Sequence, residues 1–386
     1  VQGGPGTGKT VVALHRAAYL LYTHRFPLEG QGVLVVGPNR LFIAYIEQVL
    51  PSLGEAGVDI AVLADLLRPA GRVDKLDDEQ TGRVKGDLRM IPVMARAVAD
   101  RERPLRDELI VGLGVQRLRL TVEESRRIIK EARRRSRGHN SGRKIVEELV
   151  FEALGASARK PVDAATVRER VRHEIPVREA LDRMWPVLTP AHLLHDLYGS
   201  RALLRSANRG QFTDEEIQRL HRPRAHHADD VIWRFQDVPL LDEARALLGY
   251  RPGKRDADAV RTYGHICLDE AQDLSPMELR LISRRSLNGS MTVVGDIAQA
   301  TGAWANEDWS SVLSELPARH ETQLRDLAVG YRIPGPAREL ANRVLPHAAP
   351  GLQPPRAVRT DGDAPRIVAA TDLVADLVGV VRSELD

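Results

Sequence analysis

The first ten residues hold the clearest chemical pattern in the chain, a glycine-rich run that ends in lysine and threonine. A loop of this composition wraps a polyphosphate with its backbone N–H groups, while the lysine reaches the β- and γ-phosphates and the threonine hydroxyl ligates Mg²⁺. The sequence therefore predicts a binding site for a nucleoside triphosphate. The predicted phosphate-binding residues are Gly3, Gly4, Pro5, Gly6, Thr7, Gly8, Lys9 and Thr10, with Thr10 also a metal ligand.

Two more groups of polar residues follow short apolar runs near the other end of the chain. Asp269 and Glu270 open the segment DEAQD directly after the run 264–268. In phosphate-loop NTPases an aspartate in this position holds Mg²⁺, and the next carboxylate can take a proton from the attacking water. Gln299 follows the run 291–295 and can hydrogen-bond the γ-phosphate or that water. We expect all three side chains beside the triphosphate.

A sheet whose strands end beside the glycine-rich loop is needed to bring these residues together. Apolar, β-branched runs between helical segments predict an α/β fold with a doubly wound parallel sheet. Residues 1–2 are expected to be the end of a buried strand, which predicts that the sequence is a fragment. The predicted strands are 32–37, 264–268, 291–295 and 366–370, the predicted helices are 11–22 and one that ends at Leu50, and 350–365 is the most loop-like stretch.

Composition excludes several classes of protein. With 386 residues, 43% hydrophobic and only 4% aromatic, the chain has the makeup of a globular protein of two to three domains. No segment is apolar enough to span a bilayer. A single cysteine excludes a disulfide framework and cysteine-rich metal sites, and without a signal-peptide pattern we expect a cytoplasmic protein. The net charge of +3 does not by itself indicate nucleic-acid binding.

Residues 63–262 differ from the rest, because long helical segments rich in Arg and Glu replace the strand-like runs. We interpret them as a helical insertion. Its segment 126–144 has nine basic residues and one acidic residue, which fits contact with nucleic acid, contact with an acidic protein surface, or a pair of helices with solvated charges. The histidines 221, 226 and 227 fit loop positions better than a metal site, since no cysteine or helical acid partner accompanies them. Asp242 and Glu243 are predicted at a helix start, without a catalytic role.

The motifs together resemble a known family. The glycine-rich loop, DEAQD, the GDIAQ of 295–299 and the GYR of 330–332 occur in the order found in UvrD/Rep-type superfamily helicases. The segments GGPGTGKT, VVGPN, DEAQDLSPMELR and GDIAQATGAW are more closely similar to the HelD family, the bacterial motors that release and recycle RNA polymerase. The resemblance covers residues 1–60 and 263–345, and the insertion only by its placement and length.

The resemblance implies a fold and a set of roles. The first RecA-like lobe comprises 1–62 and 263–327, the helical insertion 63–262 interrupts it, and 328–386 is the truncated start of a second RecA-like lobe. ATP and Mg²⁺ are the implied cofactors. Lys9, Thr10, Asp269, Glu270 and Gln299 are implied to bind or hydrolyse ATP, and Arg332 is implied to reach the γ-phosphate from the second lobe, where an arginine stabilises the transferring phosphoryl group.

The sequence departs from the helicase pattern where helicases hold a DNA strand. The helicases place a tyrosine and a tryptophan three and five residues after the glutamine, and an arginine after the tryptophan; here these positions are Gly302, Trp304 and Ala305. Stacking on an aromatic ring contributes about 1–3 kcal/mol per base, so we expect a weaker grip on nucleic acid. The threonine–asparagine pair of the helicases is Pro38–Asn39 here. Trp304 fits either packing between lobes or contact with a strand.

Three hypotheses follow. The first is an ATP-hydrolysing motor of the HelD type, which remodels RNA polymerase or dissociates it from nucleic acid, in the bacterial cytoplasm. The second is a 3′–5′ translocase or helicase on single-stranded DNA. The third is a truncated, non-hydrolysing fragment that only binds nucleotide or a partner protein. None of them involves a membrane.

Overall fold

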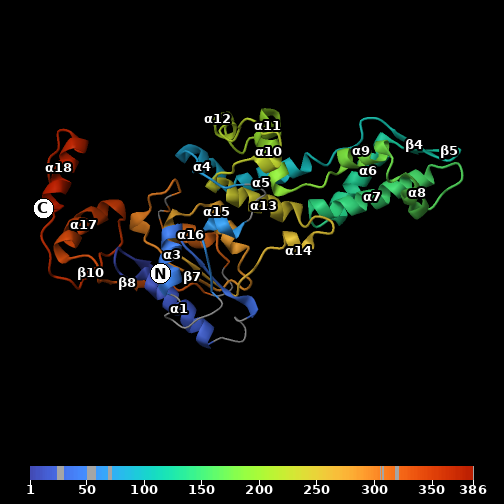
Figure 1. Cartoon of the computed structure of the whole chain (residues 1–386). Coiled ribbons are helices and arrows are strands. Elements are labelled where there is room, and N and C mark those ends of the chain that lie inside the picture. Colours follow the sequence, from blue (N-terminus) through green and yellow to red (C-terminus); the bar gives the residue numbers. More distant parts are fainter. Residues whose placement is uncertain are drawn as a thin grey trace.

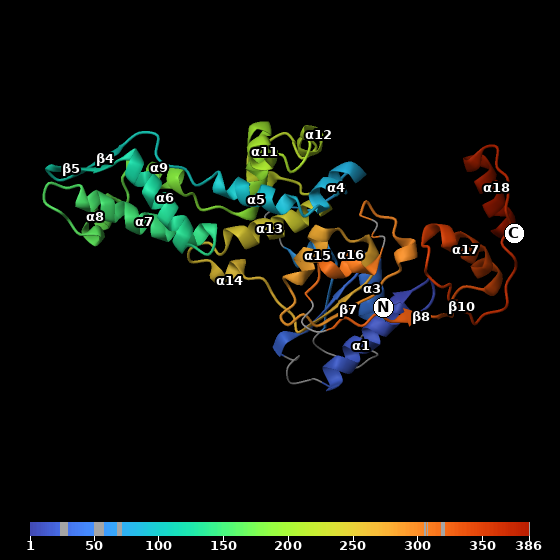
Figure 2. The ribbon, with the colours of Figure 1, turned by 180° about the vertical axis from the view of Figure 1, so that it is seen from behind.

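The computed structural model describes residues 1–23, 30–49, 58–67, 72–304, 306, 308–317 and 321–385. Within these ranges the chain is an α/β structure built around parallel strands. Helices from the middle of the sequence extend as an arm to one side of the sheet, and the C-terminal helices lie on the opposite side (Figures 1 and 2).

The central sheet contains strands from both ends of the chain. Four parallel strands pair in the order β3-β2-β6-β7. Beyond β7 lies β1, joined to it by a parallel bridge between Gln2 and Gly295, and β1 pairs in turn with β8. The strands are β1 (Gln2–Gly3), β2 (Val33–Val36), β3 (Val58–Ala61), β6 (His265–Leu268), β7 (Met291–Val293) and β8 (Asp326–Leu327).

Both faces of the sheet are covered, which explains the nearly continuous apolar sequence of its strands. Successive side chains of a strand point to opposite faces, so Leu34 and Val36 pack on one side and Val33 and Val35 on the other. The second face is covered by α1 (Lys9–Thr23) and α3 (Arg40–Val49). The first face is covered by α13 (Val238–Leu248), α15 (Pro276–Ser283) and α16 (Trp309–Ser314).

The arm has two hydrophobic cores. Its inner half shares one core with the sheet, in which Met94 and Leu240 join Leu34 and Ile266. Its outer half packs around its own core, which includes Phe151 and Trp185. The inner helices are α4 (Glu79–Gly86), α5 (Met90–Ala99), α10 (Pro190–Tyr198), α11 (Arg201–Asn208) and α12 (Asp214–Gln218); the outer elements are β4 (Leu109–Leu113), β5 (Gln116–Leu120), α6 (Val122–Arg135), α7 (His139–Ala156), α8 (Ala164–Val171) and α9 (Ile175–Met184); and α14 (Arg255–Asp258) leads back to β6.

The C-terminal part forms a second, smaller unit. Its strands β9 (Val329–Gly330) and β10 (Arg356–Ala357) pair in parallel. The helix α17 (Gly335–Ala348) connects them, and α18 (Leu373–Leu385) follows. Leu373 and Val374, two apolar residues of α18, are each 74% exposed.

The structure confirms three of the four predicted strands, as β2, β6 and β7, and the predicted helix 11–22 as α1. The predicted strand 366–370 is wrong: these residues have no regular structure, and Ile367 is 83% exposed. A strand needs a neighbour for its backbone hydrogen bonds, and an apolar run alone does not supply one. The strands β3, β8, β9 and β10 and the hairpin β4–β5 were not predicted from the sequence. Leu50, where a helix was predicted to end, lies outside the described residues.

Candidate nucleotide-binding site

The glycine-rich loop connects the end of β1 to the start of α1. Gly6 and Gly8 have φ angles of 71° and 87°, in the left-handed region that glycine adopts at no steric cost. Lys9 is the first residue of α1, so the unpaired N–H groups of that helix face the loop and favour an anion there. The sequence folds in this way because apolar residues from Ala13 onward bury α1 against the sheet.

Hydrogen bonds fix the shape of the loop. The buried Lys9 donates from Nζ to the carbonyl oxygen of Gly3 at 2.8 Å. The Thr7 hydroxyl donates to the carbonyl oxygen of Gly4 at 2.7 Å. The loop thus holds the Lys9 ammonium group inside its curve, where it can meet a phosphate.

Thr10 and Asp269 meet although they are 259 positions apart in the sequence. The Thr10 hydroxyl, at the start of α1, donates to Oδ2 of Asp269 at 2.6 Å, just beyond the end of β6. Burial raises the pKa of Asp269; the hydrogen bond from Thr10 opposes this rise, and the charge of Glu270 adds to it. An added cation would relieve the cost of this buried carboxylate.

The donor set fits Mg²⁺. Magnesium takes oxygen ligands and is usually bound by one or two protein groups together with waters and phosphates, rather than by a cage of protein ligands. Thr10 and Asp269 offer one hydroxyl and one carboxylate at the mouth of the loop. In the described part of the chain, no group of three or more His, Cys, Asp or Glu residues could hold a metal by itself.

Glu270 adopts a strained backbone conformation, with φ at 50°. Its N–H donates to Oδ1 of Asp269 at 2.9 Å, and its own carboxylate accepts from Nε2 of Gln272 at 2.8 Å. A non-glycine residue in the left-handed region costs about 1–3 kcal/mol and often marks a functional site. The turn separates the two adjacent carboxylates, one bound to Thr10 and the other to Gln272.

Gln299 belongs to a buried hydrogen-bond network that the sequence analysis did not foresee. Its Nε2 donates to Oδ2 of Asp296 at 2.7 Å, and Oδ1 of Asp296 accepts from Nε2 of Gln2. The Asp296 N–H donates to Oε1 of Gln272 at 3.0 Å. The network therefore joins β1, DEAQD and the Gln299 turn. A polar Gln2 inside a buried strand was the only signal for it in the sequence.

Two arginines of the C-terminal unit lie against the glycine-rich loop. The Tyr331 N–H donates to the carbonyl oxygen of Gly6 at 2.9 Å. This hydrogen bond puts the exposed Arg332 beside the loop, so closely that a methyl group on Gly6 would come within 2.7 Å of the Arg332 Cβ. The buried Arg338 donates from Nη2 to the carbonyl oxygen of Pro5 at 3.0 Å. The Arg332 side chain makes no hydrogen bond or ion pair with the described residues, so none of them neutralises its charge.

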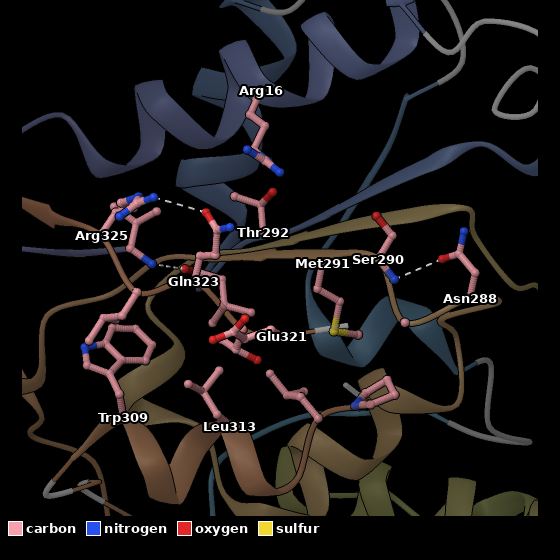
Figure 3. Close-up of a pocket in the computed structure, with 17 residues that line it drawn as sticks. Arg16, Asn288, Ser290, Met291, Thr292, Trp309, Leu313, Glu321, Gln323 and Arg325 are labelled. Carbon is pink, nitrogen blue, oxygen red and sulfur yellow. Dashed lines mark hydrogen bonds between the residues drawn. The ribbon is translucent and has the colours of Figure 1, made fainter. Parts of the chain in front are cut away.

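A cavity of about 740 Å³ lies elsewhere, beside β7 and the segment 321–325 that leads into β8 (Figure 3). Arg16 of α1 is on one side, and Trp309 and Leu313 of α16 are on the other (Figure 3). The backbone nitrogen of Val1 donates to the carbonyl oxygen of Val293 at 2.6 Å. None of the predicted site residues lines this cavity.

The remaining predicted residues lie outside the site. Asn39 caps α3, because its side-chain oxygen accepts from the Phe42 N–H at 2.9 Å. The indole of Trp304 packs against α4. Ala305 lies outside the described residues. The basic segment 126–144 forms parts of α6 and α7, as the helix-pair interpretation predicted.

Two acidic residues and three histidines of the arm were also considered from the sequence. Asp242 and Glu243 are inside α13 rather than at its start, are buried, and form ion pairs with arginines of α15 and the residues after it. His226 and His227 are exposed, and His221 is half-buried.

Neither a scan against protein-family models nor a search of curated proteins finds a match for the sequence. Among the helices of the described ranges, none combines the length and apolarity needed to cross a membrane.

Proposed function

We propose that the chain is an ATPase that binds Mg·ATP in the glycine-rich loop of a RecA-like lobe. The observation that carries this proposal is the 2.6 Å contact between the Thr10 hydroxyl and the Asp269 carboxylate. Such a pair can bind one Mg²⁺ ion beside the phosphates. The site also lies where the parallel strands β1, β6 and β7 end, the edge at which open α/β sheets bind ligands.

Each neighbouring polar group has a role in this proposal. Lys9 holds the β- and γ-phosphates, and Glu270 accepts a proton from the attacking water. Gln299 orients that water or the γ-phosphate. Arg332, which comes from the C-terminal unit, stabilises the charge of the transferring phosphoryl group.

The output of the cycle is proposed to be mechanical. Closure of two units around a nucleotide moves whole elements, and the arm is the largest element attached to this sheet. We infer from the resemblance to HelD proteins that the arm acts on RNA polymerase and releases it from nucleic acid. The choice of partner comes from that resemblance alone.

Turnover and capture experiments test the proposal. Lys9→Ala should abolish ATP hydrolysis, and Glu270→Gln should bind ATP yet retain it without turnover. The purified protein should capture RNA polymerase, and the captured complex should survive nuclease treatment. Unchanged turnover in both variants would contradict the site. ATPase activity that single-stranded DNA stimulates manyfold, with no polymerase captured, would instead support the 3′–5′ translocase.

A further inference from the structure

Trp304 stands five residues after Gln299, at the end of the turn that leaves the candidate site. Its indole is in contact with the arm. The indole Nε1 donates to the carbonyl oxygen of Gly82 in α4 at 3.4 Å. This N–H edge of the ring therefore faces a helix of the arm.

A second glycine of α4 makes that contact possible. A methyl group built on Gly86 would come within 2.3 Å of the Trp304 Nε1 and 2.6 Å of the Ser275 Cβ. Glycine in a helix costs roughly 0.5–1 kcal/mol relative to alanine, and a close approach is one reason to retain it. Gly82, one turn earlier, has room, since a methyl group there would meet only Gln236 at 3.7 Å. Gly86 is thus the residue fitted to the indole.

Hydrogen bonds connect the turn before Trp304 to the DEAQD segment of the candidate site. Oδ1 of Asp273 accepts from the N–H groups of Thr301 at 3.0 Å and Gly302 at 3.3 Å. Gln272 binds both Glu270 and the Asp296 N–H, and Asp296 holds Gln299. If nucleotide binding or hydrolysis shifts Glu270 or Gln299, these hydrogen bonds would move the turn that contains Trp304.

On the arm side, buried ion pairs tie α4 to α13. Lys85, which is 3% exposed, lies 2.6 Å from an oxygen of Asp77 and 2.8 Å from an oxygen of Asp237, at the start of α13. Burial alone would raise the pKa of Asp237, but the charges of Lys85 and Arg222 outweigh burial and lower it. The carboxylate is therefore held in its charged form, and α4 and the start of α13 are joined as one unit.

The far end of α13 meets the outer half of the arm. Asn140 of α7 donates from Nδ2 to the carbonyl oxygen of Gly249 at 3.2 Å, directly after α13. Gly138, just before α7, packs on the backbone of Leu248 and Gly249. A continuous series of contacts thus runs from the Gln299 turn through Trp304, α4 and α13 to α7.

We propose that Trp304, seated against Gly82 and Gly86, transmits the nucleotide state of the site to the arm instead of stacking on a nucleic-acid base. This inference depends on the proposed function, because it assumes that nucleotide binds near Gln299. Trp304 is a positioning residue here, with no contact to the reacting atoms.

The test compares two glycine variants of one helix. Gly86→Ala forces the indole out of its seat, whereas Gly82→Ala leaves it in place and serves as the matched control. Trp304→Ala and Trp304→Phe remove the contact from the other side. For each protein, binding of the fluorescent analogue mant-ATP is measured first, and hydrogen exchange of 79–86 and 238–248 is then compared with and without Mg·AMP-PNP.

The expected result is a nucleotide-dependent change of exchange in both helices for the wild-type protein and Gly82→Ala, and its loss in Gly86→Ala and Trp304→Ala with mant-ATP still bound. Gly86→Ala should also lower the melting temperature more in the wild-type background than in the Trp304→Ala background, where only the close approach to the Ser275 Cβ remains. A nucleotide response that persists in Trp304→Ala would overturn the inference. Quenching of tryptophan emission by oligo(dT) that disappears in Trp304→Phe would also overturn it, in favour of base stacking. Failure of wild-type protein to bind mant-ATP would instead refute the ATPase proposal itself.

Discussion

The strand that ends just before Asp269 contains a buried histidine that should make the sheet sensitive to acid. His265 of β6 is 1% exposed, with Nδ1 at 2.7 Å from the Ser290 hydroxyl and Nε2 at 2.9 Å from the Thr292 hydroxyl. Burial lowers its pKa from 6.5 to about 4, and the charge of Arg16 acts in the same direction. The native sheet therefore favours the neutral ring.

The sign of the effect follows from this direction. Above pH 6.5 both the folded and unfolded states are neutral at His265, and the histidine adds no pH dependence. As the pH falls below 6.5 the unfolded chain binds a proton that the native site resists, so stability declines until the native pKa near 4 is reached. A lowering from 6.5 to about 4 corresponds to a loss of about 3 kcal/mol. His265→Gln, which does not titrate and can still bond a neighbouring hydroxyl, should lack this decline.

Cys267 is a local probe for the measurement. It is the single cysteine of the chain, lies in the same strand two residues from His265, and is 1% exposed. A thiol reagent that reacts in acid, such as 4,4′-dithiodipyridine, labels it only when the sheet opens. After correction for the reactivity of a free thiol, labelling of the wild-type protein should accelerate about a hundredfold more than labelling of His265→Gln as the pH falls from 6.5 to 4. The same acceleration in both proteins would refute the reasoning.

Three other substitutions test contacts that hold the arm and the C-terminal unit. Lys85→Met leaves Asp237 short of a buried partner and should cost about 3 kcal/mol of unfolding free energy in urea, whereas Arg83→Met on the exposed side of α4 should change it by less than about 0.5 kcal/mol. Gly142→Ala would place a methyl group 2.5 Å from the Trp185 ring and should destabilise the outer core by about 1–3 kcal/mol, while Gly112→Ala, with open space around it, should not; equal melting curves would contradict the packing. Arg338→Met removes the donor to Pro5 and should speed proteolysis between 329 and 358, unlike the exposed Arg343→Met.

Most of the elements that were predicted from the sequence have a pattern that spans only a few residues. The glycine-rich loop and the strands β2, β6 and β7 each have a recognisable pattern within a few residues of sequence, and their positions were predicted. The hairpin β4–β5 had a usable signal that the arginine-rich composition obscured, because Leu118 and Leu120 alternate with exposed arginines as in a half-buried strand. The segment 366–370 shows the converse, an apolar run that forms no strand.

Such short patterns do not predict contacts between residues that are far apart in the sequence. The polar Gln2 in a buried strand indicates that its side chain needs a partner, but the sequence does not identify that partner as Asp296. The sequence also does not indicate that Trp304 meets two glycines more than two hundred residues earlier. The meeting of Thr10 and Asp269 was expected only because the two motifs occur together in one chain. The buried ion pairs of Asp242 and Glu243 with arginines of the α15 region likewise depend on folding of the arm onto the sheet.

Equilibrium binding of mant-ATP, with and without Mg²⁺, tests the central claim most directly. The wild-type protein should bind the nucleotide, and Mg²⁺ should tighten binding if Thr10 and Asp269, which meet at 2.6 Å, hold the ion beside the phosphates as proposed. Lys9→Ala should lose binding, and Asp269→Asn should lose the effect of Mg²⁺ while retaining weaker metal-free binding. If Lys9→Ala and Asp269→Asn bind Mg·mant-ATP as tightly as the wild-type protein does, the glycine-rich loop is not a nucleotide site and the account is contradicted.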